Sequence, residues 1–483
     1  MQNFSNLYKI HIETLGCRLN QIESESIAKS FSDAGFSISM ESVTAKSIIQ
    51  NEVIISVLNT CTVTQKSEQK ARRIIRLMLE KFPQAVILVT GCYAQLNSDE
   101  ILQIDKRVFV IGGQIKSRIT KIPQLLTEYL QKNDFNPFDF INYLQLLIKT
   151  PQLKQFFPEN TFRLSTSSFF AHSRASLKIQ DGCNNNCSYC AIHLARGKSV
   201  SIDVKTALER VIELENKGYD EVVLTTVNIG QYRGIFESQY FDFKTLLKYL
   251  LENTKKIRFR ISSLYPEIID DSFCDVIKNP RVQPHFHISV QSGSNKILSL
   301  MNRRYSKEEV ITACKKLKNA KNDPFLACDI ITGFPGETDS DFEETMQLCK
   351  ECGFAWVHAF PYSQRPGTEA VNLNNKVPQY ISGERAGKIT QWAISQKIDY
   401  CNRFVGKKLP AILESVKRPK LISQNQSGYI YHAVTENFLH CEIIEKDGFL
   451  APKTGSSVKV RILGEYEAGT KKGGETECLA EII

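Results

Sequence analysis

The stretch that decides the fold reads Asp181-Gly182-Cys183-Asn184-Asn185-Asn186-Cys187-Ser188-Tyr189-Cys190. Its C-x3-C-x2-C spacing lets a single loop present three thiolates together. An iron–sulfur cube normally takes four cysteine ligands, so three would leave one iron open. The amino and carboxylate groups of S-adenosylmethionine can chelate such an iron while its sulfonium is reduced to a radical. The spacing therefore predicts that Cys183, Cys187 and Cys190 are metal ligands of a radical-generating 4Fe–4S cluster.

Zinc is the alternative metal for this loop. Structural zinc sites take four ligands, commonly in paired C-x2-4-C knuckles. His193 lies close enough in the sequence to serve as a further ligand, but no second knuckle follows it. The spacing favours the iron–sulfur cluster over zinc or unliganded thiols.

The composition is that of an ordinary globular protein. On length alone, 483 residues allow roughly two to four domains. There is no long uncharged apolar segment, and residues 1–16 lack the basic-then-apolar layout of a signal peptide, so we expect a cytoplasmic protein without a membrane segment. In that compartment 14 cysteines favour metal or redox use over disulfides. The formal charge of +9 permits an RNA partner without requiring one.

Residues 1–125 alternate between strand-like and helix-like patterns, which indicates a parallel sheet covered by helices. Apolar, β-rich runs occupy residues 8–12, 53–58 and 85–89, and a cysteine follows each of them: Cys17, Cys61 and Cys92. Ligand sites of open α/β sheets form beyond the carboxyl ends of the strands. Gly16 and Gly91 directly precede two of these cysteines and admit close backbone approach. We predict a second metal cluster on the three cysteines; three buried structural thiols are the alternative.

The alternation resumes in residues 169–402 with a longer period. The candidate strands are residues 176–179, 221–225, 257–261, 285–290, 327–331 and 356–360. Six β-then-α units predict a partial (βα)6 barrel, whose chemistry belongs at the C-terminal face of its strands. Residues 126–168, rich in aromatic and amide side chains, are interpreted as an irregular or partly helical linker.

Residues 403–483 contain short β runs separated by turn signals. The runs are residues 409–416, 428–434, 438–444, 458–463 and 477–483. They predict a small antiparallel β-barrel of OB-like character, a frequent nucleic-acid module. Tyr429, Tyr431 and Phe438 could stack on bases or could equally fill the barrel.

Taken together, these motifs make the chain resemble the radical S-adenosylmethionine methylthiotransferases. The matching segments are residues 14–21 (TLGCRLNQ), 59–64 (NTCTVT), 91–92 (GC), the C-x3-C-x2-C loop, 195–199 (ARGKS), 291–294 (QSGS), 333–338 (GFPGET) and 365–368 (RPGT). The resemblance covers nearly everything except residues 126–168. It implies an α/β chain of four parts: an N-terminal methylthiotransferase domain carrying an auxiliary cluster (1–125), the linker (126–168), a radical core (169–402) and a TRAM-like barrel (403–483).

The resemblance also implies a substrate. The sequences of residues 15–21, 59–64 and 227–230 most resemble those of the branch that acts on threonylcarbamoyladenosine beside the tRNA anticodon. The implied function is methylthiolation of the C2 carbon of that nucleoside. The alternatives are isopentenyladenosine in tRNA and an aspartate of a ribosomal protein. The chain departs from the usual pattern at Thr226, at His193-Leu194 and at Val200, which bears on substrate identity more than on reaction class.

An aromatic C–H carbon offers no acidic proton, so the cofactor and not an acid–base residue must supply the reactive radical. By resemblance the cofactors are two 4Fe–4S clusters and S-adenosylmethionine, and the cluster on Cys17, Cys61 and Cys92 presents the sulfur. Gln291 and Ser292 are candidates for binding the cofactor ribose, with a structural turn as the alternative. The implied partners are the tRNA anticodon stem-loop and an electron-donor protein. The sequence does not indicate an oligomeric state. A non-catalytic iron–sulfur protein would explain six cysteines but not the barrel.

Overall fold

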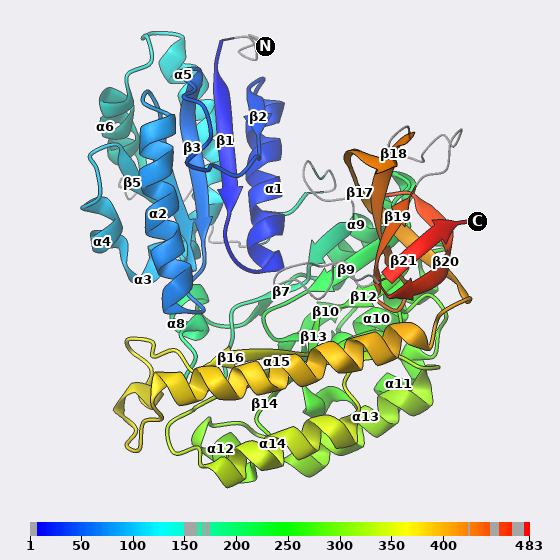
Figure 1. The fold of residues 1–483 in the computed structure, drawn as a ribbon. Coiled ribbons are helices and arrows are strands. Elements are labelled where there is room, and N and C mark those ends of the chain that lie inside the picture. Colours follow the sequence, from blue (N-terminus) through cyan, green and yellow to red (C-terminus); the bar gives the residue numbers. More distant parts are fainter. Residues whose placement is uncertain are drawn as a thin grey trace. The chain divides into compact units, whose positions relative to one another are not determined.

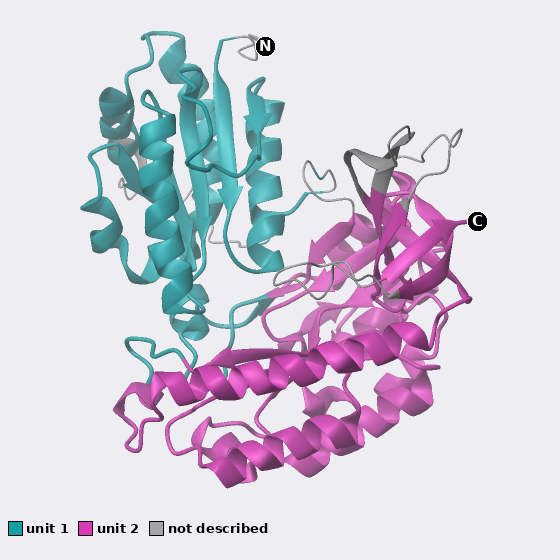
Figure 2. Ribbon diagram, viewed as in Figure 1, with its two compact units in different colours: residues 1–171, 181–200, 363–368 teal, residues 172–180, 201–362, 369–483 magenta. Residues whose placement is uncertain are grey.

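The computed structural model describes residues 7–148, 162, 164–166, 169, 174–423, 426–444, 454–465 and 478–483. The chain forms two compact units (Figure 2). The first comprises residues 1–171, 181–200 and 363–368, and the second comprises residues 172–180, 201–362 and 369–483. Among the described residues, no helix is long and apolar enough to cross a membrane.

The first unit is built on a parallel sheet with strand order β2-β1-β3-β4-β5 (Figure 1). Its strands are β1 (Lys9–Thr14), β2 (Ser37–Ser39), β3 (Val53–Thr60), β4 (Val86–Gly91) and β5 (Val108–Val110). Every residue of β3 and β4 is buried, as expected for parallel strands covered on both faces. The predicted open parallel sheet is confirmed.

Helices cover both faces of this sheet. They are α1 (Arg18–Asp33), α2 (Gln65–Lys81), α3 (Cys92–Leu96), α4 (Ser98–Leu102), η1 (Gly113–Lys121), α5 (Ile122–Leu130) and α6 (Pro137–Ile148). One core cluster packs Phe31 of α1 and Leu126 of α5 against strand residues, and the other packs Ile75 of α2 in the same way. Helix α6 lies in the range interpreted as a linker, and its Phe140 and Leu144 are fully buried in the first cluster. Residues 149–161, also in that range, lie outside the described residues.

The second unit contains a curved row of parallel strands, arranged as β12-β9-β6 and β13-β14-β15-β16. The strands are β6 (Ala175–Lys178), β9 (Glu221–Thr225), β12 (Arg258–Ile261), β13 (Ser263–Leu264), β14 (His285–Gln291), β15 (Phe325–Thr332) and β16 (Trp356–Pro361). Only Ser262 separates β12 from β13, so these two short strands are one interrupted stretch of chain. Counted as one strand, they join the two sheets into a single row of six strands. This is the predicted partial (βα)6 barrel.

Helices alternate with these strands. They are α8 (Ile192–Arg196), which belongs to the first unit, and α9 (Val204–Asn216), α10 (Phe243–Glu252), α11 (Asp271–Ile277), α12 (Asn295–Leu300), α13 (Lys307–Ala320), α14 (Asp339–Cys352) and α15 (Gln379–Asn402). Shorter elements are β7 (Gln180–Asp181), β8 (Val200–Ser201), β10 (Gly234–Phe236), β11 (Gln239–Phe241), η3 (Ile229–Gln231), η4 (Pro266–Ile268) and η5 (Glu369–Asn372).

A closed five-stranded barrel with order β17-β18-β19-β21-β20 completes the second unit. Its strands are β17 (Lys408–Ser423), β18 (Gln426–Thr435), β19 (His440–Ile444), β20 (Ser457–Glu465) and β21 (Cys478–Ile482). The predicted small barrel is confirmed with one difference, since β19 and β21 run parallel. A closed ring of five strands cannot be antiparallel throughout, because alternating directions cannot return to their starting point after an odd number of steps.

The barrel is tied to the parallel strands of its own unit. The Arg260 guanidinium of β12 donates to both carboxylate oxygens of Glu221 at 2.7 and 2.9 Å and to the backbone oxygens of Thr435 and Glu436 at 3.1 Å. The Phe438 ring stacks on His285 with centroids 3.9 Å apart.

Two of the barrel aromatics serve packing. Tyr431 is only 4% exposed and fills the barrel, which was one of the two expectations, whereas Phe438 packs at the junction with the parallel strands, against His285 and Phe325. The side chain of Tyr429 lies outside the described residues. A disulfide joins Cys401 of α15 to Cys478 of β21, whereas the sequence favoured metal or redox use of cysteines over disulfides.

Candidate metal centres in the first unit

The three strand-end cysteines come together at one edge of the first sheet. Cys17 caps the start of α1 beyond β1, Cys61 directly follows β3, and Cys92 opens α3 directly after β4. Because β1, β3 and β4 are adjacent and parallel, their carboxyl ends meet at the same edge. Cys61 and Cys92 are buried, whereas Cys17 is exposed.

Two glycines make this convergence possible. Gly16 has φ +110°, and a Cβ placed on it would lie 2.5 Å from Cys61 Cβ and 3.0 Å from Cys61 Sγ. Gly91 has φ +97°, and its Cβ would lie 2.3 Å from the backbone oxygen of Thr60. Both positions combine a left-handed backbone with a close neighbour, so any side chain would push the cysteine loops apart. The space that the missing Cβ atoms leave is taken by the approaching thiol and backbone.

The thiols influence one another electrostatically. Burial is the main cause that raises the pKa of Cys61 to about 12, and the neighbouring Cys17 and Cys92 contribute to this rise. Burial also raises the pKa of Cys92, while the positive charges of Arg196 and Lys116 act in the opposite direction. Two buried thiols, Cys61 and Cys92, with two cations nearby suit ligands that become thiolates only when a positively charged metal centre accepts them.

The C-x3-C-x2-C loop belongs to the same compact unit. Its backbone is shaped around its own sulfurs: Asn185 N–H donates to Cys183 Sγ and Ile192 N–H donates to Cys190 Sγ, both at 3.4 Å. Ser199 N–H donates to the Asn184 side chain at 2.9 Å and so closes the loop. Amide hydrogen bonds to cysteine sulfur are one way in which proteins hold and tune iron–sulfur clusters.

Arg196 links the two sets of cysteine loops within this unit. Its guanidinium donates to Asp181 Oδ1 at 2.8 Å, to Glu23 Oε1 at 3.2 Å and to Asn20 Oδ1 at 2.6 Å. Asp181 lies two residues before Cys183, and Asn20 lies three residues after Cys17. Lys116 Nζ contacts the same Glu23 carboxylate at 2.5 Å. Burial alone would lower the pKa of Arg196, but the carboxylates of Asp181 and Glu23 hold it well above the ordinary value.

The type and the number of ligands in each cysteine set fit an iron–sulfur cluster. Each set consists of three cysteines, the thiol ligands that such clusters use, and each set is incomplete by one ligand. Among the described residues, no group of three His, Cys, Asp or Glu side chains is arranged to hold a single metal ion. In a cube each cysteine binds a different iron, so its ligands surround the cluster and do not converge on one atom.

Gln291 and Ser292 lie in the second unit at the carboxyl end of β14. Gln291 has φ +70°, an uncommon backbone for a residue with a side chain, and is 7% exposed. Ser292 Oγ accepts from Ser294 N–H at 3.2 Å and lies 3.4 Å from Thr345 Oγ1 of α14. Ser292 therefore takes part in the turn that leads into α12 and packs against α14, whereas the left-handed backbone of Gln291 is of the kind that gathers at functional sites. A cofactor role for either residue stays a prediction.

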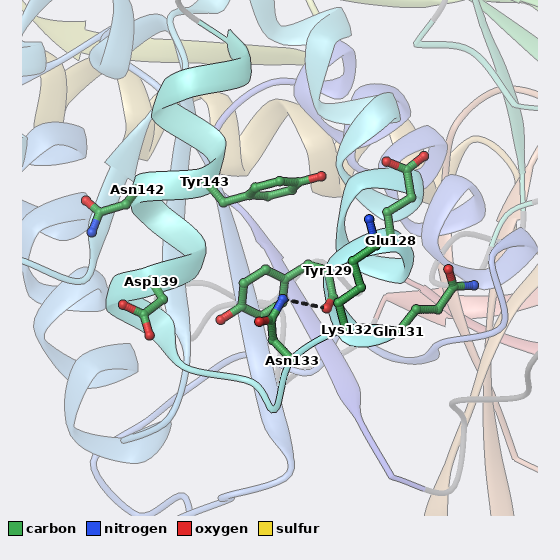
Figure 3. Close-up of a pocket in the computed structure, with 8 residues that line it drawn as sticks. All are labelled: Glu128, Tyr129, Gln131, Lys132, Asn133, Asp139, Asn142 and Tyr143. Carbon is green, nitrogen blue, oxygen red and sulfur yellow. Dashed lines mark hydrogen bonds between the residues drawn. The ribbon is translucent and has the colours of Figure 1, made fainter.

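A cavity of about 450 Å³ opens elsewhere in the first unit, between α5 and α6 (Figure 3). Figure 3 shows Tyr129 and Tyr143 beside charged and amide side chains of the two helices and their connection. None of the predicted site residues lines it.

Sequence reasoning missed the charged residues around the thiols, Glu23, Lys116 and Asp181. Arg196 lies in the ARGKS motif, but the motif does not show which residues it contacts. On α1 the polar residues Asn20, Glu23 and Glu25 are buried, contrary to the usual pattern in which polar positions face water. A run of polar residues directly after a candidate metal ligand was the one available signal.

Comparisons with known proteins agree with this architecture. A family model described as the radical SAM superfamily matches residues 177–349, and one described as the uncharacterized protein family UPF0004 matches residues 9–113. The threonylcarbamoyladenosine tRNA methylthiotransferase MtaB of Treponema pallidum is 40% identical over 95% of this chain and 99% of its own length.

Two further matches are more distant. The tRNA-2-methylthio-N(6)-dimethylallyladenosine synthase of Neorickettsia sennetsu is 28% identical over 87% of this chain and 86% of its own length. The solved structure of the radical S-adenosylmethionine methyltransferase TsrM from Kitasatospora setae has a TM-score of 0.49 at 12% identity, covering 75% of this chain and 76% of that one.

Proposed function

Because this chain belongs to the radical S-adenosylmethionine methylthiotransferase family, we propose that it methylthiolates the C2 carbon of N6-threonylcarbamoyladenosine next to the anticodon of a tRNA. Family membership makes the chain an enzyme and implies S-adenosylmethionine and a 4Fe–4S cluster as cofactors. The substrate, the second cluster and the roles of individual residues are the parts that we propose.

The choice of substrate rests on the relatives. Proteins named as threonylcarbamoyladenosine tRNA methylthiotransferases match at 40% and 32% identity, over 95% and 86% of this chain. A protein named for dimethylallyladenosine matches at 28%. This difference in sequence identity supports the threonylcarbamoyl branch. The motif sequences around Cys17, Cys61 and Asn228 agree with it.

We assign a different task to each cysteine set. Cys183, Cys187 and Cys190 would hold the cluster that binds S-adenosylmethionine, and Cys17, Cys61 and Cys92 would hold a second 4Fe–4S cluster. When bound, these groups supply the radical and the sulfur. The chain itself buries Cys61 and Cys92, sets the spacing of these thiols and Cys17 through Gly16 and Gly91, and fixes the C-x3-C-x2-C loop through backbone amides.

The observation that carries the proposal of two clusters is the Arg196 contact set. One buried guanidinium binds Asn20 beside Cys17 of the strand-end cysteines and Asp181 beside Cys183 of the C-x3-C-x2-C loop. A side chain shared between two loops keeps them in register, since the planar fork of arginine fixes both partners at once. Two chemically linked metal centres need that kind of fixed relation, whereas two unrelated structural sites do not.

We further propose that Gln291 and Ser292 contact the bound S-adenosylmethionine. The buried, left-handed Gln291 at a strand end supports this more than Ser292, whose hydroxyl is engaged in the turn. The proposed partners are the tRNA anticodon stem-loop and an electron-donor protein.

Incubation with defined substrates tests the substrate assignment. The anaerobically reconstituted enzyme receives, in parallel, tRNA carrying threonylcarbamoyladenosine, tRNA carrying isopentenyladenosine, and ribosomal protein, and nucleosides and peptides are analysed by mass spectrometry. We expect the methylthio product on the threonylcarbamoyl tRNA alone. Product on isopentenyladenosine alone would move the chain to the sister branch, and product on the ribosomal protein would overturn the RNA assignment.

Iron content tests the second cluster. Two sites imply about eight irons per chain after reconstitution, and a Cys17→Ala chain should hold about four. Saturation of the wild-type chain at about four irons, with no effect of the substitution, would remove the second cluster from the proposal.

A further inference from the structure

The strands β14, β15 and β16 present two very different faces. Ile288, Cys328 and Val357 are register partners across the three strands, and each is fully buried. Cys328 lies against Cys349 of α14, so this face is covered by helices. Side chains alternate along a strand, so His287, Asp329 and His358 occupy the opposite face. That face carries charged and ring side chains that the assigned cofactor chemistry does not use.

These side chains form one connected cluster. His287 Nε2 lies 3.0 Å from Asp329 Oδ2, and the rings of His287 and His358 have centroids 5.4 Å apart. Further along β16 the ring of Phe360 lies nearly parallel to His358, at an interplanar angle of 14°. His358 is exposed and Phe360 is 44% exposed, although both lie on a strand whose other face is core. Accessible, parallel rings beside a carboxylate–imidazole pair are suited to a planar ligand.

His358 has a defined protonation state. Trp356 Nε1–H donates to His358 Nδ1 at 3.2 Å, which places the proton of the neutral ring on Nε2. Partial desolvation by its neighbours is the main cause that lowers the pKa of His358 to about 4, and the neighbouring His287 contributes to this shift. At neutral pH the ring is therefore uncharged and offers a single N–H donor.

The surroundings favour a ligand with a negative group. Within the cluster Asp329 supplies one carboxylate, while two cations act on it from outside: Arg303 on Asp329 and Lys397 of α15 on His358. Lys397 Nζ lies 4.3 Å from the centre of the Trp356 ring. The Nε2–H of His358, flanked by these cations, can donate a hydrogen bond to a carboxylate of the ligand. An apolar substituent would leave this N–H without a hydrogen-bond partner.

We propose that His287, Asp329, His358 and Phe360 bind the target base, and that His358 recognises the carboxylate-bearing substituent that distinguishes threonylcarbamoyladenosine from isopentenyladenosine. The inference rests on the proposed function and names the residues that select its substrate. Phe360 and the His358 ring supply a stacking surface for the purine. The Trp356 indole is a positioning group, because its N–H fixes which ring nitrogen of His358 carries the proton.

Binding of synthetic anticodon stem-loops tests this without turnover. Three stem-loops that differ only at the target adenosine, which is threonylcarbamoylated, isopentenylated or unmodified, are titrated at one fixed salt concentration into the cluster-loaded protein. The wild-type protein should prefer the threonylcarbamoyl stem-loop over the unmodified one by about ten- to a hundredfold, the usual range for one hydrogen bond to a charged group.

His358→Phe keeps a stacking ring but removes the donor. It should reduce the preference to about unity while leaving the affinity for the unmodified stem-loop unchanged. Trp356→Phe retains the ring beneath Lys397 but frees the tautomer of His358, so it should give an intermediate preference. His440→Phe is the matched control on β19 of the barrel and should leave the preference as in the wild type. Equal melting temperatures establish that the variants are folded.

S-adenosylmethionine also combines an adenine with a carboxylate, so its binding is measured on the same proteins. Unchanged affinity for S-adenosylmethionine in His358→Phe supports the proposal, and a loss there in place of the stem-loop preference overturns it. A wild-type preference that His358→Phe retains in full overturns this inference alone. A wild-type protein that prefers the isopentenyl stem-loop, or none, overturns the proposed function together with the inference.

Discussion

The two cysteine sets each supply three ligands, but the fold brings those ligands together in different ways. Cys183, Cys187 and Cys190 come from one loop, and backbone amides of that loop donate to their sulfurs. Cys17, Cys61 and Cys92 come from three strand ends, and their proximity depends on the order of the sheet and on two glycines. A local set can be recognised from spacing alone and tolerates changes elsewhere. An assembled set depends on every element that holds its parts together.

The largest expected effect separates the chemistry of the two sets. Cys187→Ala should abolish the formation of deoxyadenosine from S-adenosylmethionine, because the loop then has too few ligands for its cluster. Cys61→Ala should retain that cleavage but give no methylthio nucleoside, because only the assembled set is lost. Both products are measured by mass spectrometry after anaerobic incubation with a chemical reductant.

Cys274→Ala is the matched control for both changes. Its thiol is 7% exposed, against 6% for Cys61 and 7% for Cys187, and it belongs to neither set. It should retain both activities. If Cys61→Ala and Cys187→Ala lose the same activities while Cys274→Ala is normal, the division of tasks between the two sets is wrong.

Arg196 is the side chain that the two sets share, so its removal should be the most damaging single change outside the thiols. Arg196→Met leaves the Glu23 and Asp181 carboxylates buried without this partner, at a cost of about 3–5 kcal/mol in the free energy of unfolding. The melting temperature and the iron content should both fall. Arg403→Met removes an exposed ion pair with Asp323 and should cost less than about 1 kcal/mol. Equal losses of stability and of iron in the two variants would mean that Arg196 contributes no more than an exposed ion pair.

Gly16 tests whether the assembled set depends on close backbone approach. Gly16→Ala places a Cβ 2.5 Å from Cys61 Cβ on a backbone with φ +110°. The strain should cost about 1–3 kcal/mol and should displace Cys61. Iron bound by the assembled set should therefore fall, while deoxyadenosine formation persists.

The matched control is Gly383→Ala in α15, where an added Cβ meets nothing within 4 Å. In a helix this change should stabilise the chain by about 0.5–1 kcal/mol. A Gly16→Ala chain that binds as much iron as the wild type would show that the glycine is not needed for the site.

The sequence predicted most elements because their patterns are local. The strand at residues 221–225 coincides with β9, and the remaining predicted strands overlap observed ones, since a buried parallel strand is a short apolar run bounded by turn residues. The parallel pair β19–β21 was not predicted, because strand direction in a closed ring is a property of the whole barrel. The boundaries at residues 125, 168 and 402 stay predictions.

The surroundings of the thiols could not be predicted for a related reason. Glu23 and Lys116 are charged residues far apart in the sequence, and charged side chains are mostly solvent-exposed. Their burial follows from contact with each other and with Arg196, which no periodicity shows. Likewise His287, Asp329 and His358 lie on three separate strands, so only the register brings them together.

The smallest expected effect concerns the helix that follows the assembled set. Helix α2 begins four residues after Cys61, and its Lys66, Lys70 and Arg73 are exposed along one face. If this face contacts tRNA phosphates, Lys70→Gln should weaken tRNA binding by about fivefold at physiological salt and lower the slope of log affinity against log salt by about 0.7–0.9. Filter binding over a range of salt concentrations measures both. Lys205→Gln, an equally exposed lysine on α9, should change neither. If Lys70→Gln leaves the slope of log affinity against log salt unchanged, the basic face of α2 is solvated and does not contact tRNA. The assembled cysteine set would then have no RNA contact on the helix that follows it.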